Sequence, residues 1–354
     1  MIFTGVKAEP ARVKSSKLFA VITTIQPPTT SVRKLCRALR PLDALLLIVG
    51  DRKGPCAYPL AGTELLSLDQ QLAQPLRLAK LLPLNHYVRK NLGYLTAISR
   101  GAECIYETDD DNGPSANWNL RSPSVRARRV SGPRWFNVFR HFSDEHIWPR
   151  GFPLREILAS GSRKPRRAGP VATFDSPIQQ GMVDRHPDVD AIWRLVIGED
   201  RYFQKAASVA LMPGVWCPFN SQTTWWFPTA YPLMYLPSFC TFRMTDIWRS
   251  FVAQRCLWAM DSALTFHQAE VIQQRNVHNL LKDFEDEVPG YLRNESICET
   301  LENVNLKRGP EAVGDNLLRC YEALAEQGIF PKKELRLVRA WLRDLDEIAG
   351  GLVV

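Results

Sequence analysis

The chain has 354 residues, of which 45% are hydrophobic and 23% charged, and this composition excludes a disordered protein. Lysine and arginine outnumber aspartate and glutamate by 45 to 37, so the formal net charge is +8. That excess suits phosphate-bearing partners, but no nucleic-acid-binding motif accompanies it, and we expect no nucleic acid to bind.

Strands and helices alternate in the first third of the chain. Apolar runs predict strands over 18–25, 45–49, 65–68 and 102–106. Apolar residues at helical spacing predict helices over 32–39 and 88–99, and Thr30 or Ser31 can cap the first of these. The alternation predicts an α/β fold with a mostly parallel sheet, whose ligands bind at the carboxyl ends of the strands.

The rest of the chain contains loops, a second structured block and a helical tail. Residues 113–170 are rich in Pro, Gly, Ser and Arg. The block 171–280 includes a predicted helix over 245–263. Two amphipathic stretches, 317–325 and 335–348, predict an antiparallel helical hairpin at the C-terminal end of the chain.

Three adjacent carboxylates, Asp109, Asp110 and Asp111, come shortly after the strand predicted over 102–106. Most acidic triplets are solvated turns, and that interpretation stays open here. The position of this triplet at the ligand edge of the sheet favours a divalent cation, which would relieve the repulsion between the carboxylates. Oxygen ligands suit Mg²⁺ or Mn²⁺. Such a cation bridges a nucleotide diphosphate and neutralises charge when a sugar–phosphate bond breaks.

Several segments carry a family resemblance, in chain order: 66–71 (LSLDQQ), 87–98 (YVRKNLGYLTAI), 101–102 (GA), 105–112 (IYETDDDN), 148–154 (WPRGFPL), 187–190 (PDVD), 246–258 (DIWRSFVAQRCLW), 340–342 (AWL) and 344–345 (DL). Together they resemble the STELLO family of plant and nematode glycosyltransferase-like proteins. The resemblance covers roughly residues 17–348. It implies a glycosyltransferase-A type fold, with a Rossmann-like sheet, that binds a nucleotide sugar.

A more distant resemblance is to the UDP-arabinopyranose mutases, also called reversibly glycosylated polypeptides. They share the aspartate triplet, the segment 150–153 (RGFP) and the segment 187–191 (PDVDA). In those enzymes an arginine soon after the Arg-Gly segment becomes glycosylated, and Arg155 is the nearest candidate, at a shorter spacing. That departure ranks a sugar-nucleotide mutase below a metal-dependent glycosyltransferase. A non-catalytic scaffold for glycan-synthesising enzymes is the third alternative.

The resemblance assigns metal ligands within and beyond the triplet. Asp111 is the first expected ligand and Asp109 the second, while Asp110 accepts a hydrogen bond from a sugar hydroxyl. His267, which follows a predicted strand, completes the metal shell, and His278 is its competitor. A structural role is the alternative for either histidine.

Further residues are expected at the nucleotide sugar: Asp51, Arg89, Lys90, Arg150 and Arg249. Surface ion pairs are the alternative for Arg89 and Lys90, and a turn is the alternative for Asp51. An inverting transfer needs a carboxylate base beside the acceptor hydroxyl. Asp246 is the first candidate, although an aspartate at a helix start is also a good cap. Asp188 and Asp190 are the other candidates, because residues two apart on an extended segment point the same way.

These assignments divide the chain into an N-terminal extension (1–16), a catalytic domain (17–280) and a C-terminal helical region (281–354). Within the catalytic domain we expect a nucleotide-sugar half over about 17–112 and an acceptor half over about 135–280. The expected partners are a UDP-linked sugar, a glycan or other hydroxyl acceptor, and a membrane surface touched by basic loops. The longest apolar run, 44–49, is too short to cross a bilayer, so we expect a cytoplasmic or otherwise soluble chain, although the plant relatives are Golgi-anchored.

Overall fold

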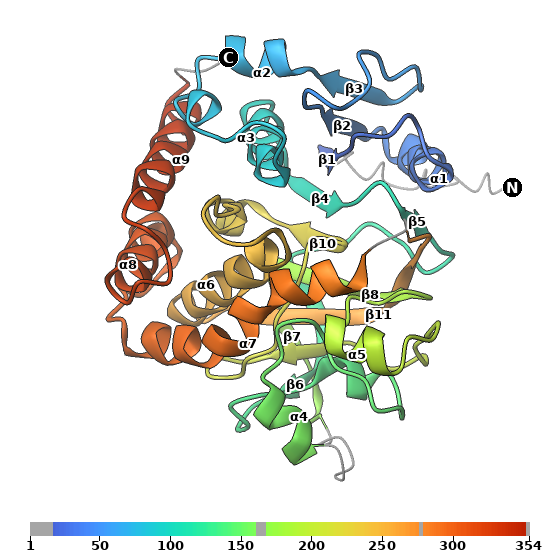
Figure 1. The fold of residues 1–354 in the computed structure, drawn as a ribbon, viewed down its shortest axis with the longest axis vertical. Coiled ribbons are helices and arrows are strands. Elements are labelled where there is room, and N and C mark those ends of the chain that lie inside the picture. Colours follow the sequence, from blue (N-terminus) through green and yellow to red (C-terminus); the bar gives the residue numbers. More distant parts are fainter. Residues whose placement is uncertain (1–16, 161–167, 276–278, 352–354) are drawn as a thin grey trace, which may run out of the picture.

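The computed structural model describes residues 17–160, 168–275 and 279–351, drawn in colour in Figure 1. The strands are β1 (Leu18–Thr23), β2 (Leu45–Val49), β3 (Thr63–Leu66), β4 (Cys104–Thr108), β5 (Asn112–Pro114), β6 (Ser124–Val130), β7 (Val171–Asp175), β8 (Ile178–Asp184), β9 (Val209–Leu211), β10 (Thr223–Trp226) and β11 (Leu264–Gln273). The α-helices are α1 (Thr30–Leu39), α2 (Leu68–Ala73), α3 (Lys90–Ser99), α4 (Leu154–Ser160), α5 (Ala191–Val196), α6 (Thr245–Ala259), α7 (Leu280–Asn303), α8 (Val313–Glu326) and α9 (Glu334–Ala349).

One mixed sheet runs through the described part of the chain, in the order β3-β2-β1-β4-β10-β8-β11-β9-β6-β7, with β5 paired to β11. The first four strands are parallel, as expected. The antiparallel strand β10 then joins β4 to β8. Because β4 and β10 are paired, the two expected halves of the catalytic domain share a single sheet. The division into domains itself stays a prediction.

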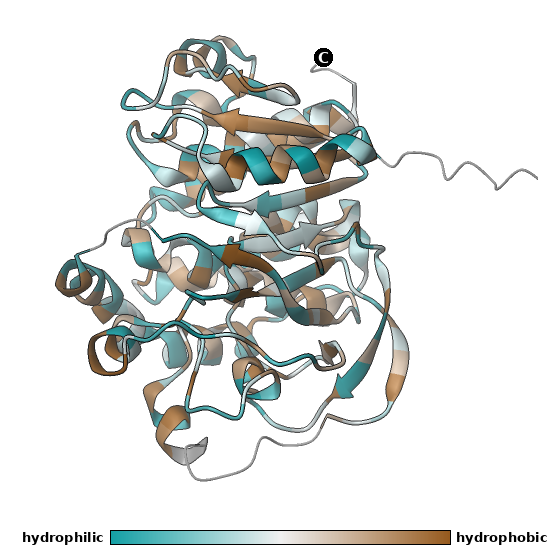
Figure 2. Ribbon diagram, turned by 90° about the vertical axis from the view of Figure 1, so that its right-hand side faces the viewer, coloured by the Kyte–Doolittle hydropathy of each residue, from teal (hydrophilic) through white to brown (hydrophobic). Residues whose placement is uncertain are grey.

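Helices cover both faces of the parallel strands, and Figure 2 shows apolar residues concentrated in these strands. Alternate residues of β1 face opposite sides: Phe19 and Val21 belong to the core cluster that contains α3, whereas Ala20 and Ile22 belong to the cluster that contains α1. Gly93 allows α3 to lie close to the sheet, because a Cβ atom there would come within 2.5 Å of Val49 Cγ2. Close packing therefore fixes the helix that leads into β4.

The C-terminal helices α8 and α9 pack against each other as a hairpin along one side of the molecule (Figure 1). The Asp344 carboxylate on α9 accepts hydrogen bonds from the backbone N–H groups of Arg77 and Leu78, both at 2.9 Å. This contact ties the hairpin to the segment between α2 and α3. The expected α/β class, with a Rossmann-like parallel half and a C-terminal helical hairpin, is confirmed.

Several element boundaries differ from the predicted ones. The cap of α1 is Thr29, whose hydroxyl accepts from the Val32 N–H at 3.1 Å, and neither Thr30 nor Ser31 takes that role. Strand β4 extends to Thr108, so the aspartate triplet directly follows it. None of the helices in the described ranges combines the length and apolar character needed to cross a membrane. The predicted N-terminal extension lies outside the described residues.

Candidate active site

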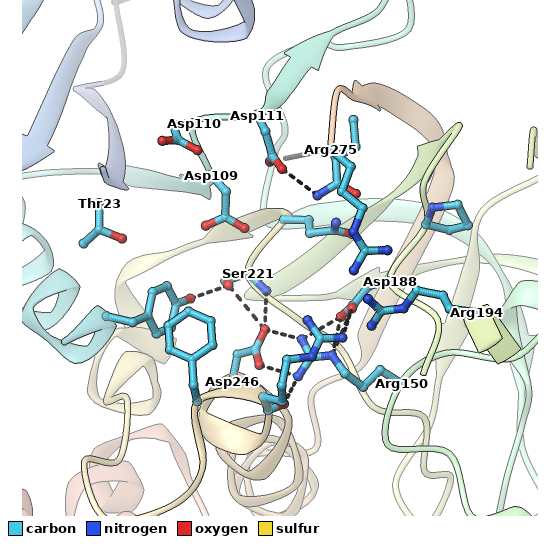
Figure 3. Close-up of a pocket in the computed structure, with 16 residues that line it drawn as sticks. Thr23, Asp109, Asp110, Asp111, Arg150, Asp188, Arg194, Ser221, Asp246 and Arg275 are labelled. Carbon is cyan, nitrogen blue, oxygen red and sulfur yellow. Dashed lines mark hydrogen bonds and ion pairs between the residues drawn. The ribbon is translucent and has the colours of Figure 1, made fainter. Parts of the chain in front are cut away.

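Two adjoining cavities lie at the carboxyl ends of β1, β2 and β4. The inner cavity has a volume of about 220 Å³ and is shown in Figure 3; its wall includes Thr23, Tyr87, Asp109, Asp110, Asp111, Arg150, Pro187, Asp188, Arg194, Ser221, Gln222, Phe242, Arg243, Asp246, Gln273 and Arg275. The outer cavity has a volume of about 710 Å³ and a wall that includes Thr23, Thr24, Ile25, Gln26, Val49, Gly50, Asp51, Lys53, Asn85, His86, Tyr87, Arg89, Asp110 and Phe242. Thr23, Tyr87, Asp110 and Phe242 belong to both walls, so the two cavities meet at these residues.

All three carboxylates of the aspartate triplet line the inner cavity, Asp110 also lines the outer one, and each has a different partner. Asp109 Oδ1 accepts from Lys90 Nζ at 3.0 Å. Asp110 Oδ2 accepts a short hydrogen bond from the Thr24 hydroxyl. Asp111 Oδ2 accepts from Gln273 Nε2 at 2.9 Å, whereas its buried Oδ1 has no hydrogen-bond partner among the described residues. The triplet therefore offers a free carboxylate oxygen inside the inner cavity.

The carboxylates of the triplet resist ionisation in this environment. Burial raises the pKa of Asp111 to about 7, and the neighbouring Asp109 and Asp110 charges add to the effect. Burial also raises the pKa of Asp109 to about 6, although the Lys90 ammonium opposes the shift. Burial raises the pKa of Asp110 in the same direction. A bound cation would stabilise all three charged forms, because it replaces repulsion with attraction.

The Arg150 guanidinium joins two aspartates on the opposite wall of the inner cavity (Figure 3). Its Nε and Nη2 donate to Asp188 at 2.9 and 2.7 Å, and its Nη1 and Nη2 donate to Asp246, both at 3.0 Å. Burial acts to raise the pKa of Asp188, but Arg150 and Arg243 outweigh it and hold that pKa below its usual value. Arg150 thus orients two of the predicted catalytic carboxylates.

Gly151 makes this placement of Arg150 possible. Its φ is +87°, a conformation that L side chains rarely adopt. A Cβ atom at this position would also overlap Ile247 on α6. The Arg-Gly pair seen in the sequence is therefore a structural requirement for bringing the arginine against the start of α6.

Asp246 points into the inner cavity and does not cap α6, which has no side-chain cap. Its Oδ2 accepts from three groups: Arg150 Nη2 at 3.0 Å, and the backbone N–H and the hydroxyl of Ser221, both at 3.3 Å. Its Oδ1 accepts only from Arg150 Nη1 among the described residues. Oδ1 therefore retains a lone pair for a further donor.

Asp188 and Asp190 do not face the same way, contrary to the expectation. Asp188 lies in the inner cavity wall, whereas Asp190 is the N-cap of α5 and accepts from the Trp193 N–H at 2.8 Å and from Trp148 Nε1 at 2.7 Å. Burial raises the pKa of Asp190 to about 7. The segment before α5 turns into a helix, and the two-residue periodicity of an extended strand does not apply.

The residues predicted at the nucleotide sugar fall into two groups. Asp51 and Arg89 line the outer cavity; Asp51 Oδ2 accepts from the His86 N–H at 3.0 Å, and Arg89 Nε donates to Gln71 Oε1 at 2.7 Å. Lys90 is fully buried and reaches the site through Asp109. The alternative of surface ion pairs for Arg89 and Lys90 is therefore wrong, because both side chains are buried.

Arg249, predicted to bind the nucleotide sugar, is placed elsewhere. Its Nη1 donates to Glu107 Oε1 at 2.8 Å in a fully buried ion pair, and its guanidinium lies over the Trp226 ring at 5.0 Å. Glu107 also accepts from Tyr94 and, at 2.8 Å, from the Trp226 indole. Arg249 thus joins α6 to β4 beneath the triplet and is not part of the wall of either cavity.

The predicted histidine ligand His267 is also absent from both cavity walls. Its Nδ1 pairs with the Ser208 hydroxyl at 2.7 Å and its Nε2 with Gln179 Oε1 at 2.9 Å, so both ring nitrogens have partners. Burial lowers the pKa of His267 well below its usual value, and the charge of Arg121 acts in the same direction. Its competitor His278 lies outside the described residues. The structure thus gives His267 a structural environment on β11.

Arg155, the candidate for self-glycosylation, lies on α4 with its side chain 85% exposed, 3.8 Å from Glu295. It is absent from both cavity walls, whereas Arg150 lies inside the inner cavity. This placement gives no support to a glycosylated Arg155.

Several residues of the inner cavity were missed by the sequence analysis: Tyr87, Arg194, Ser221, Gln222, Phe242, Arg243, Gln273 and Arg275. Gln273 and Arg275, at and just beyond the end of β11, carry the same signal as the triplet: polar residues that follow a strand. Ser221 and Gln222 stand before β10 in an aromatic stretch, where no local pattern marks them.

The triplet fits a divalent cation held jointly with a diphosphate. Among the described residues, no three His, Cys, Asp or Glu side chains are grouped closely enough to hold a metal by themselves. Mg²⁺ and similar ions are commonly held by one or two carboxylates together with substrate phosphates. The unpartnered Asp111 Oδ1 and the nearby Asp109 match that pattern, and they are the residues that would hold the ion.

The sequence model of the family described as STELLO glycosyltransferases matches residues 243–351. "Probable glycosyltransferase STELLO1" of Arabidopsis thaliana is 26% identical over 96% of this chain and 45% of its own length. "Probable glycosyltransferase STELLO2" of the same plant is 25% identical over 96% of this chain and 46% of its own length. The chain thus spans less than half the length of these relatives. A solved structure described as "Crystal Structure of a Mycobacterial Protein" aligns with 80% of this chain and 74% of its own, at a TM-score of 0.40 and 10% identity.

Proposed function

We propose that this chain, which is similar to the STELLO glycosyltransferases, is a metal-dependent glycosyltransferase that uses a UDP-linked sugar and a hydroxyl-bearing acceptor. One observation carries the proposal: the aspartate triplet, with an unpartnered buried oxygen on Asp111, lines the inner cavity and reaches the outer one through Asp110. The outer cavity has the volume to take a nucleoside, and the inner cavity is lined by the charged groups that act on the sugar.

In this proposal, Asp111 and Asp109 would hold Mn²⁺ or Mg²⁺, which supplies charge neutralisation to the diphosphate as it leaves. Lys90 keeps Asp109 in place through the 3.0 Å contact. Asp51 and Arg89, in the wall of the outer cavity, bind the nucleoside. The donor thus runs from the outer cavity across the triplet into the inner cavity.

Asp246 is the proposed base. Arg150 and Ser221 fix its carboxylate, and its Oδ1 keeps a lone pair for the acceptor hydroxyl. The acceptor oxygen bonds to the anomeric carbon, the bond from that carbon to the diphosphate oxygen breaks with its electrons on the diphosphate, and the hydroxyl proton moves to Asp246. An inverting displacement requires no other base.

A thermal-shift panel of nucleotide sugars, each with and without Mn²⁺, tests the donor and the metal together. We expect UDP-sugars to raise the melting temperature only when the cation is present, because a ligand that binds the folded state alone stabilises that state. Asp111→Asn should remove that stabilisation, whereas Glu64→Gln, on the edge strand β3 and absent from both cavity walls, should keep it. UDP binding of equal strength in EDTA would refute the metal bridge.

A further inference from the structure

Phe242 is a large apolar side chain left 55% exposed at the place where the two cavities meet. Exposed single apolar residues are common on proteins and by themselves mean little. This one differs in position, because it lies in the walls of both cavities, among carboxylates and guanidinium groups. An aromatic ring in such polar surroundings offers an apolar face on which a ligand can stack.

The segment that carries Phe242 is anchored on both sides. The Thr241 hydroxyl donates to the Asp286 carbonyl at 2.6 Å, and the Arg243 carbonyl accepts from the buried Arg150 guanidinium. The Tyr87 ring packs edge-on against Phe242, with centroids 5.5 Å apart. The segment that carries Phe242 is therefore anchored on both sides, and its ring lies in the walls of both cavities.

A second, independent observation points to a ligand in the same cavity. Gln222 lies in the inner wall, and its buried Oε1 has no hydrogen-bond partner among the described residues. Its backbone is held on both sides: the N–H donates to Asn220 Oδ1 at 2.9 Å and the carbonyl accepts from the Thr108 hydroxyl at 2.6 Å. A buried acceptor without a donor is unfavourable unless a ligand supplies the donor.

We infer that Phe242 and Gln222 form an acceptor subsite for a pyranose ring, so that the acceptor is a carbohydrate. The polarised C–H bonds on one face of a pyranose pack against the negative face of an aromatic ring. A ring hydroxyl donates to Gln222 Oε1, and the reacting hydroxyl faces Asp246 Oδ1. The transfer reaction at this subsite rests on the proposed function. Binding of a saccharide to the subsite does not, and it can be measured in the absence of a donor.

A hydroxyl on a peptide or a long-chain alcohol would satisfy Asp246 equally well. Neither ligand has a flat face of C–H bonds bordered by hydroxyl donors, which is what Phe242 and Gln222 together require. The other ligand group that could stack on Phe242 is the nucleobase of the donor, because Phe242 also lines the outer cavity. The experiment therefore measures saccharide and nucleotide binding separately.

Binding of neutral cello-, manno- and galacto-oligosaccharides to the whole chain, without donor, is measured by saturation-transfer NMR. We expect one of these series to bind through its C–H protons. Phe242→Ala and Phe242→Leu should each weaken that binding about tenfold, whereas Phe242→Trp should keep it within about threefold. Leu292→Ala is the matched control, since Leu292 is an exposed apolar residue on α7 that is absent from both cavity walls; it should bind like the wild type.

Calorimetry of UDP with Mn²⁺ completes the test. If Phe242→Ala weakens UDP binding and leaves saccharide binding unchanged, the ring stacks on the nucleobase and the inference is wrong. Absence of saccharide binding by the wild type overturns it as well. Saccharide binding that depends on Phe242, in a protein that does not bind UDP, would refute the proposed donor and keep the carbohydrate subsite.

Discussion

Replacing Arg150 with methionine tests the arrangement on which the proposed base depends. The substitution removes a guanidinium that bridges Asp188 and Asp246, whose side chains are only 7% and 8% exposed. It leaves two carboxylates buried without their shared cation. Breaking a buried ion pair from one side typically destabilises a protein by about 3–5 kcal/mol, and we expect a loss in that range near neutral pH.

The pH dependence of this loss has a definite sign. Arg150 helps hold the pKa of Asp188 below its usual value, and that stabilisation is present above the unfolded-state pKa of about 3.9 and disappears as the pH falls through the folded-state pKa. In Arg150→Met the charged carboxylates destabilise the fold instead, and protonation relieves them. The difference between wild type and variant should thus be largest near neutral pH and shrink towards about pH 4.

Urea unfolding at two pH values measures the difference. The control is Arg100→Met, which removes a surface ion pair with Glu64 whose side chains are 40% and 39% exposed. Exposed pairs contribute about 0–1 kcal/mol, so the control should lose little stability. If Arg150→Met is no more destabilising than Arg100→Met, the guanidinium does not hold the two buried carboxylates, and the proposed orientation of Asp246 fails.

Three other predictions concern single positions. Asp111→Asn should stabilise the ligand-free protein above pH 7, because burial raises the pKa of Asp111 to about 7 and ionisation of the carboxyl group therefore opposes folding. This gain in stability should vanish as the pH falls towards about 4, and a series of thermal-shift measurements at different pH values tests it. Asp246→Asn should slow transfer by about two to four orders of magnitude, as product analysis would show, while Mn²⁺-dependent UDP binding persists. It should also destabilise the fold by about 1–3 kcal/mol in urea unfolding, because the new amide group faces the Arg150 guanidinium. Gly151→Ala should destabilise the protein by at least about 2 kcal/mol through its positive φ and the overlap with Ile247, and an unchanged unfolding midpoint would contradict the required close approach.

Local patterns identified some of the site in advance. The aspartate triplet stood out because it follows a short apolar strand, and the carboxyl end of a parallel strand is where such folds bind ligands. The amphipathic periods of α8 and α9 predicted the helical hairpin. Other local signals were present and not used: Ser67 and Gln70 form a capping box at the start of α2, and Asp190 precedes the apolar turn that it caps.

The sequence by itself determined the elements whose apolar pattern is local, the α/β class and the position of the triplet. Only the tertiary structure decided which charged residues meet. Arg150 reaches Asp246 from 96 positions away, and Arg249 reaches Glu107 from 142 positions away. Both are arginines, yet Arg150 lines the inner cavity and Arg249 is buried outside both cavity walls. Charge and residue type are the same in the two cases, and the difference arises from how α6 packs against the sheet, which no local pattern encodes.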